Sequence, residues 1–172
     1  MRIGFFASAA LACALATPAL AQKAAPDPLA LVDARYDRTA AVAKAIWDFA
    51  ELGYQENRSS ALLQAELAKE GFKVTKGVAE IPTAFVAEWG SGGPVIAILA
   101  EFDALPGVSQ AAVPVKQTDS KPAAHACGHN LFGSGSVTAA IALSQWLKAT
   151  GTPGRVRLYG TPAEEGGSGK VY

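Results

Sequence analysis

Residues 94–103, PVIAILAEFD, are apolar almost without interruption until two acidic side chains near the end. Such a run, set off by glycine and proline, predicts a β-strand buried on both faces. Shorter runs of the same kind occupy residues 72–75 (FKVT) and 84–90 (AFVAEWG), and residues 154–162 (GRVRLYGTP) predict another buried strand. We therefore expect a central sheet.

Apolar side chains recur at helical spacing in three other segments, residues 28–52, 57–70 and 130–149. A glycine directly follows each of the first two segments, as is common at helix ends. Helices that alternate with apolar strands predict a layered α/β domain with its site in the loops at strand ends. Residues 104–124 form a long loop punctuated by prolines, and loops of this length are usually functional.

The composition is that of a globular protein and excludes some partners. Half of the 172 residues are hydrophobic and 17% are charged. The 15 Lys and Arg residues balance 15 Asp and Glu residues, and no basic block could follow a phosphate backbone. We expect no nucleic-acid partner.

The first 21 residues have the pattern of a secretory signal peptide, with Arg2, an apolar run over residues 3–16 and the sequence ALA before Gln22. A transmembrane anchor is the alternative, but the run is short for a span of about 20 residues. We expect a linker over residues 22–27 and a mature protein that is periplasmic or secreted, without membrane contact.

Removal of the signal peptide would leave Cys127 as the single thiol, because the other cysteine is Cys13. No internal disulfide could then form in an oxidising compartment. Metal ligation is one explanation for an unpaired cysteine in an exported protein.

Cys127 lies in HACGHN, residues 125–130, which also contains both histidines of the chain. If this backbone is extended, His125, Cys127 and His129 project to one side. Imidazole and thiolate together with carboxylates form the ligand set that zinc prefers and that manganese or cobalt can use. The sequence offers Asp103 and an acid pair, Glu164 and Glu165, at the ends of predicted strands.

The acid pair has two possible roles in metal chemistry. One glutamate can bind metal while its neighbour takes a proton from a water molecule. Adjacent side chains of an extended segment point in opposite directions, so a bend is needed, for which Gly166 and Gly167 are suited. The alternatives are a solvent-exposed turn, a buried structural cysteine, or a Cys127–His129 nucleophile pair, which leaves the acid pair without a role.

Several motifs together resemble one family. EFDALPG (101–107), HACGHN and GTPAEEGGSGK (160–170), in that order, are similar to motifs of the metal-dependent amidohydrolases related to aminoacylase, carboxypeptidase G and the auxin-conjugate hydrolases. AELGYQE (50–56) resembles the N-terminal region of the same family. Many members of the family have Asp after the second histidine, whereas the aminobenzoyl-glutamate branch has Asn, and this chain has Asn130 there.

This resemblance implies a three-layer α/β/α hydrolase domain with a mostly parallel mixed sheet and two divalent metal ions, zinc or manganese. Cys127 would be a thiolate ligand shared by the metals, and His129 and Glu165 would be further ligands. Glu164 would be the general base, and Asp103 would orient a ligand. His125 is part of the motif but is not expected to touch metal.

The implied reaction is hydrolysis of an amide in an N-acyl or aminobenzoyl amino acid with a free carboxylate, by a protein that forms homodimers. The family also uses histidine ligands further downstream and a smaller dimerisation domain. We therefore interpret residues 28–172 as the N-terminal half of the catalytic domain, with an incomplete sheet and no activity alone. The alternative is an exported metal- or peptide-binding module without catalysis.

Overall fold

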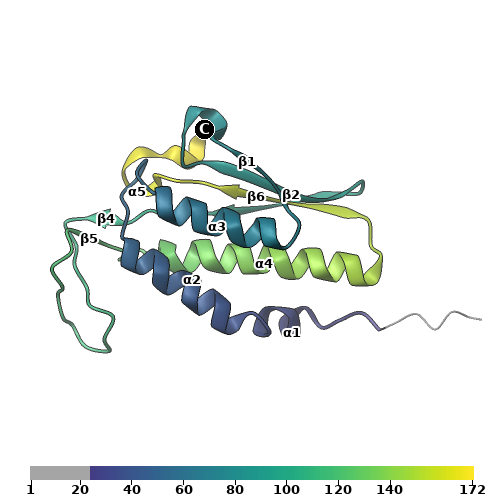
Figure 1. Ribbon diagram of the computed structural model, residues 1–172, viewed down its shortest axis with the longest axis horizontal. Coiled ribbons are helices and arrows are strands. Elements are labelled where there is room, and N and C mark those ends of the chain that lie inside the picture. Colours follow the sequence, from purple (N-terminus) through teal and green to yellow (C-terminus); the bar gives the residue numbers. More distant parts are fainter. Residues whose placement is uncertain (1–23) are drawn as a thin grey trace, which may run out of the picture.

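The structure is a computed structural model that describes residues 24–172 (Figure 1). The predicted signal peptide, residues 1–21, lies outside the described residues. The elements follow in the order α1 (Pro28–Asp33), α2 (Tyr36–Phe49), α3 (Asn57–Lys69), β1 (Lys73–Lys76), η1 (Val78–Glu80), β2 (Phe85–Ser91), β3 (Val95–Ala100), β4 (Leu105–Pro106), β5 (Ala123–Ala124), α4 (His129–Thr150), β6 (Gly154–Gly160), α5 (Glu164–Gly167) and η2 (Gly169–Val171).

The four longer strands form one mixed sheet in the order β1-β2-β6-β3. The predicted α/β class and mixed sheet are confirmed. However, β2 is antiparallel to both β1 and β6, and only β3 and β6 are parallel, so the described strands are not mostly parallel as expected. The reason lies in the connections: β3 and β6 are joined through the crossover helix α4, whereas β1 returns into β2 by a short segment.

The helices α2, α3 and α4 cover one face of this sheet (Figure 1). Helix α4 packs on β3 and β6, α3 packs on β1 and β2, and α2 packs on α4 and α3. The core between these layers contains Ile46, Leu63, Leu67, Phe85, Phe102, Ile141, Val156 and Leu158, all fully buried. Within residues 24–172 the long helices thus form a single layer, and the second helical layer of the expected three-layer domain is not seen there.

The strand that was predicted to be buried on both faces, β3, lies at the edge of the described sheet. Val95, Ile96 and Leu99 are 39, 42 and 48% exposed. They are exposed because β3 pairs with β6 alone among the described strands. Its neighbour β6 is central, with a strict alternation of buried and half-buried residues.

Two predicted segments are subdivided. The predicted helix over residues 28–52 is two helices, α1 and α2, and α2 ends at Phe49, followed by left-handed Ala50 (φ 45°). The predicted loop 104–124 contains the short antiparallel pair of β4 and β5. None of the helices in residues 24–172 is long and apolar enough to cross a membrane.

Candidate metal centre

The candidate site lies at the edge where β3 and β6 both end. Because these strands run parallel, the residues that follow them, Glu101 to Asp103 and Thr161 to Glu165, emerge on the same side. The backbone N–H of Thr161 donates to the carbonyl of Ala100 at 2.8 Å, which extends the pairing beyond the strands. Helix α4 begins at this edge with His129, so three separate segments of the chain meet there.

His129 is the centre of the cluster and is only 4% exposed. Its Nδ1 lies 2.9 Å from Oδ1 of Asp103, and its Nε2 lies 3.0 Å from Oε2 of Glu101. The second oxygen of Asp103 accepts the backbone N–H of Glu165 at 2.9 Å. Asp103 therefore fixes both the histidine ring and the start of the segment that carries the acid pair.

Two groups of side chains are spaced to hold a metal ion. Potential ligand atoms of Cys127, His129 and Glu165 all lie within 4.8 Å of one another, and so do those of Glu101, His129 and Glu164. Sulfur, imidazole nitrogen and carboxylate oxygen are the donors that zinc prefers, and oxygen-rich sets suit manganese. The first group consists of the three residues predicted as metal ligands, and the donor set of both groups fits a divalent ion.

The thiol of Cys127 is exposed, and its surroundings oppose ionisation. The negative charge of Glu165 is the main cause that raises the pKa of this thiol, with a smaller contribution from burial. A cysteine nucleophile needs the opposite, because nucleophilic cysteines have a lowered pKa. This environment favours metal ligation over the alternative Cys127–His129 nucleophile pair, since a bound metal ion displaces the thiol proton.

A backbone bend brings the acid pair to the site, but this bend lies before the pair and not after it as predicted. Glu164 and Glu165 begin the short helix α5, and the bend is made by Ala163, which has a left-handed backbone (φ 55°), and not by Gly166 or Gly167. Glu164 Oε1 accepts a hydrogen bond from Lys170 at 2.8 Å. This bond is the main cause that lowers the pKa of Glu164.

His125 does not join the metal-ligand groups. The chain turns at Gly128 (φ 89°) directly before α4, so HACGH is not extended and the three side chains do not share one side. The buried His125 ring instead places Nε2 3.1 Å from the carbonyl oxygen of Ile46 in α2. This contact connects the motif to helix α2.

Three residues near the site were missed by the sequence analysis. Glu101 offered a signal, because residues two apart in a strand share a side and Glu101 is two before Asp103. Lys170 bridges Glu101 and Glu164 at 3.0 and 2.8 Å. Glu56, which directly precedes α3, is fully buried, and its contacts hold the segment before the acid pair.

The Glu56 carboxylate connects two distant segments. One oxygen accepts the backbone N–H of Ala163 at 2.8 Å, and the other accepts the hydroxyl of Thr83 at 2.9 Å. Burial is the main cause that raises the pKa of Glu56. Because Ala163 makes the bend before the acid pair, Glu56 helps to hold Glu164 and Glu165 in place.

Side chains that could hold a metal ion, at the carboxyl ends of two parallel strands in an α/β fold, are typical of a metallohydrolase type of domain. Comparison with known proteins gives the family: residues 97–172 match the family described as Peptidase family M20/M25/M40. The matched part of the chain is similar to this family.

Curated relatives and a solved structure agree with the family assignment. The chain is 46% identical over 143 residues to one of the subunits of the p-aminobenzoyl-glutamate hydrolase of Escherichia coli, a match that covers 82% of this chain and 30% of that protein. It is 35% identical to mouse Xaa-Arg dipeptidase, over 81% of this chain and 32% of the relative. The crystal structure of the Bacillus subtilis YXEP protein, described as a dinuclear metal binding peptidase, superposes with a TM-score of 0.62 at 28% identity, covering 76% of this chain and 36% of the other. The chain thus spans about a third of the length of the curated relatives that it matches.

Proposed function

We propose that this protein takes part in metal-dependent hydrolysis of an amide bond in an N-acyl or aminobenzoyl amino acid. The observation that carries the proposal is the cluster of Cys127, His129 and Glu165 with a second carboxylate, Glu164, beside it. The 46% identity to an aminobenzoyl-glutamate hydrolase subunit supports the aminobenzoyl-glutamate type of substrate.

Each residue of the cluster has a role in this proposal. Two divalent ions, zinc or manganese, would supply the Lewis acidity that polarises an amide carbonyl and lowers the pKa of water. Cys127, His129 and Glu165 would hold metal, and Asp103 would keep the imidazole ring oriented through the 2.9 Å contact with Nδ1. Glu164 would take a proton from water and deliver it to the leaving amine nitrogen.

A small cavity beside the metal-ligand groups supports a small substrate. It has a volume of about 230 Å³ and lies next to Asp103 and Glu165. Gly53, Tyr54 and Pro106 contribute to its walls, so the pocket is largely apolar with carboxylates at one side. An acyl or aminobenzoyl group could occupy such a pocket while its amide carbonyl faces the metal-ligand groups.

The proposal includes export and self-association. The signal-like pattern of residues 1–21 supports a periplasmic or secreted location, and mass spectrometry of the mature protein should find an N-terminus at or near Gln22.

The Escherichia coli relative is named as a subunit, which is compatible with an oligomer. We propose a homodimer, to be checked by light scattering coupled to size-exclusion chromatography.

The direct test is an activity assay on the complete gene product, including any reading frame beyond codon 172. We expect release of glutamate from aminobenzoyl-glutamate, loss of this activity with a chelator, and recovery on addition of Zn²⁺ or Mn²⁺. Glu164→Gln should retain bound metal but lose most activity, by about 10²- to 10⁴-fold for a lost general base. Full activity of Glu164→Gln would exclude Glu164 as the base, and stoichiometric metal binding without hydrolysis of any amide would favour the binding module.

A further inference from the structure

One turn of the chain contacts the segment that carries the acid pair. This turn, residues 51–56, lies between α2 and α3, and the backbone N–H of Gln55 donates to the carbonyl of Leu52 at 2.9 Å. Leu52 also forms a bridge with Ala104, the residue directly after Asp103. The turn therefore has a fixed place beside the segment that follows β3.

Tyr54 reaches from this turn to the end of α5. Its hydroxyl donates a hydrogen bond to the carbonyl oxygen of Gly167, the last residue of α5, at 3.0 Å. The last carbonyls of a helix have no partner within the helix, so the hydroxyl supplies one that α5 lacks. The tyrosine ring also lies against the backbone, since a Cβ on Gly167 would be 2.5 Å from Cε2 of Tyr54. Only glycine leaves room for the ring at this position.

The backbone of Tyr54 has an unusual conformation. Its φ of 66° is in the left-handed region, which aromatic residues rarely adopt and which persists only where surrounding contacts hold it. Two neighbours in the turn supply such contacts. A Cβ on Gly53 would lie 2.9 Å from Cα of Ala163, and the carboxylate of Glu56 accepts the backbone N–H of Ala163. The turn thus contacts the chain both before and after the acid pair.

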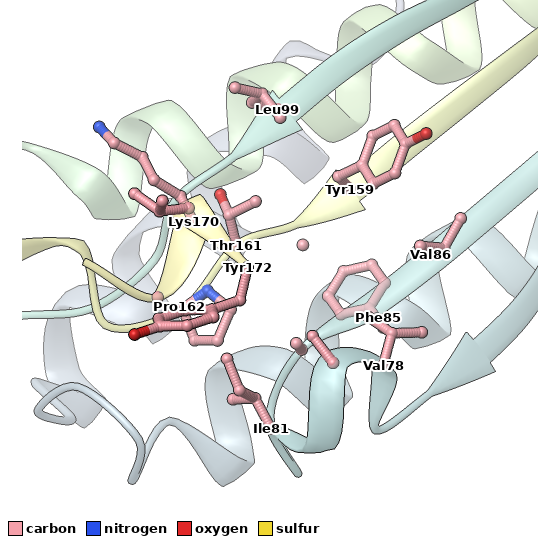
Figure 2. A pocket seen from close by; sticks show the side chains of 15 residues that line it. Val78, Ile81, Phe85, Val86, Leu99, Tyr159, Thr161, Pro162, Lys170 and Tyr172 are labelled. Atoms are coloured by element: carbon pink, nitrogen blue, oxygen red, sulfur yellow. The ribbon is translucent and has the colours of Figure 1, made fainter. Parts of the chain in front are cut away.

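The acid-pair segment has little packing of its own. Helix α5 is four residues long, and none of these residues is buried. Figure 2 shows that Pro162, Lys170 and Tyr172, which flank α5 in sequence, line a pocket of about 400 Å³. A segment with few buried contacts is easily displaced, so its position depends on the specific bonds that it makes.

We propose that Tyr54 is a positioning residue: its hydroxyl fixes α5 through Gly167 and so holds Glu164, the proposed general base, in place for proton transfer. This inference rests on the proposed function, because Tyr54 acts on the reaction only through that base. The ring of Tyr54 borders the cavity of about 230 Å³ beside Asp103 and Glu165, so a variant that keeps the ring tests the hydroxyl alone.

The test compares Tyr54→Phe with the wild type in the complete gene product, with aminobenzoyl-glutamate as substrate. Tyr54→Phe removes the hydroxyl and keeps the ring. We expect kcat to fall by about three- to tenfold, as for one lost hydrogen bond, while KM changes by less than about twofold. Such a split marks a group that acts on the transition state and not on substrate binding. Tyr36→Phe is the matched control, because Tyr36 is exposed at the start of α2 and should tolerate the change without effect on either constant.

Gly167→Ala changes the same contact from the other side. Its methyl group would displace the ring of Tyr54, so kcat should fall in this variant too. The double variant, Tyr54→Phe with Gly167→Ala, should lose less than the product of the two single losses, because both changes break one contact. Fully multiplicative losses would mean that the two residues act independently, which would overturn the inference.

Hydrogen exchange measured by NMR gives a result that needs no activity. The backbone N–H groups of Gly167 and Gly169 both donate to the carbonyl oxygen of Ala163, at 3.1 and 3.0 Å. In Tyr54→Phe these two amides should exchange about three- to tenfold faster, with the amides of α4 unchanged. Wild-type kcat in Tyr54→Phe would overturn the positioning role whatever the exchange rates. Failure of the wild type to hydrolyse any amide would overturn the proposed function, and the exchange rates would then still test whether Tyr54 holds α5.

Discussion

The Asp103 carboxylate lies 2.9 Å from Nδ1 of His129, at a position that is almost fully buried. The same carboxylate accepts the backbone N–H of Glu165 at 2.9 Å. A single side chain after β3 thereby connects the first residue of α4 to the acid pair after β6. The relative placement of two predicted metal ligands depends on this one carboxylate, because the segments that carry them are far apart in sequence.

Asp103→Asn tests this dependence. An amide has one oxygen and one NH₂ group, so it cannot accept hydrogen bonds from both the imidazole and the Glu165 backbone as the carboxylate does. We expect the affinity of the Cys127 position for Zn²⁺ to fall by about 10- to 100-fold, the usual effect of losing such a partner. Competition with a fluorescent zinc chelator measures it.

The control for Asp103→Asn is Asp119→Asn, in a loop where Asp119 bonds to Ser109 away from the cluster. It should bind Zn²⁺ like the wild type. Wild-type affinity in Asp103→Asn would mean that the histidine ring is held by other contacts.

Glu56→Gln should weaken the hydrogen bonds that hold the segment with the acid pair, Glu164 and Glu165, in place. The buried carboxylate accepts two hydrogen bonds, from Ala163 and Thr83, and glutamine would turn an NH₂ group toward one of these donors. We expect a loss of stability of about 1–3 kcal/mol, the cost of an unsatisfied buried polar group. Urea denaturation followed by circular dichroism measures the loss, and Glu51→Gln is a comparison because Glu51 accepts hydrogen bonds at the more exposed start of α3. An unchanged unfolding midpoint in Glu56→Gln would contradict this role.

The sequence predicted where the helices and strands lie along the chain better than it predicted which strands lie side by side in the sheet. Hydrophobic spacing located α3, α4 and the four longer strands, because burial on one face leaves a periodic pattern. It could not show that β6 lies between β2 and β3, which follow one another directly in the chain. Periodicity records which face of an element is buried but not which strand lies beside it, so the edge position of β3 and its exposed Leu99 were not predicted.

The sequence likewise pointed to some residues of the candidate site and missed others. Cys127 and His129 could be chosen because cysteine and histidine are scarce in this chain, and Glu165 because it lies in an acid pair followed by glycines at the end of a predicted strand. Lys170 could not, because its reach into the cluster depends on the backbone path of a glycine-rich segment in which Ser168 is left-handed (φ 50°). No pattern of side chains encodes that path.

Gly133 and Gly135 in α4 give a matched pair of stability predictions. A Cβ on Gly133 would lie 2.8 Å from the backbone oxygen of Glu101, whereas a Cβ on Gly135 would meet nothing within 4 Å. Gly133→Ala should therefore destabilise the protein by about 1–3 kcal/mol through overpacking. Gly135→Ala should stabilise it by about 0.5–1 kcal/mol, because alanine favours a helix more than glycine does. Thermal unfolding compares the two, and equal effects would contradict the close contact of α4 with the segment after β3.

Glu66 predicts how stability depends on pH away from the site. This buried residue of α3 receives hydrogen bonds from Arg38 and Lys69, and the bond from Arg38 is the main cause that lowers its pKa from 4.5 to about 2. A carboxyl with a lowered folded-state pKa stabilises the fold above its unfolded pKa of 4.5, and this contribution is lost as the pH falls toward 2. Because Arg38 is half exposed, solvent screening reduces the contribution to about 2 kcal/mol at pH 7.

Glu66→Gln should accordingly lower the free energy of unfolding by about 2 kcal/mol at pH 7, and by less than half of that amount at pH 3. Urea titrations of the wild type and the variant at both values measure the difference. Asp33→Asn, on the exposed helix α1, is the control and should change stability little at either pH. A difference between Glu66→Gln and the wild type that stays constant from pH 7 to pH 3 would show that Glu66 acts through packing, because only an ionised carboxylate loses its contribution on acidification.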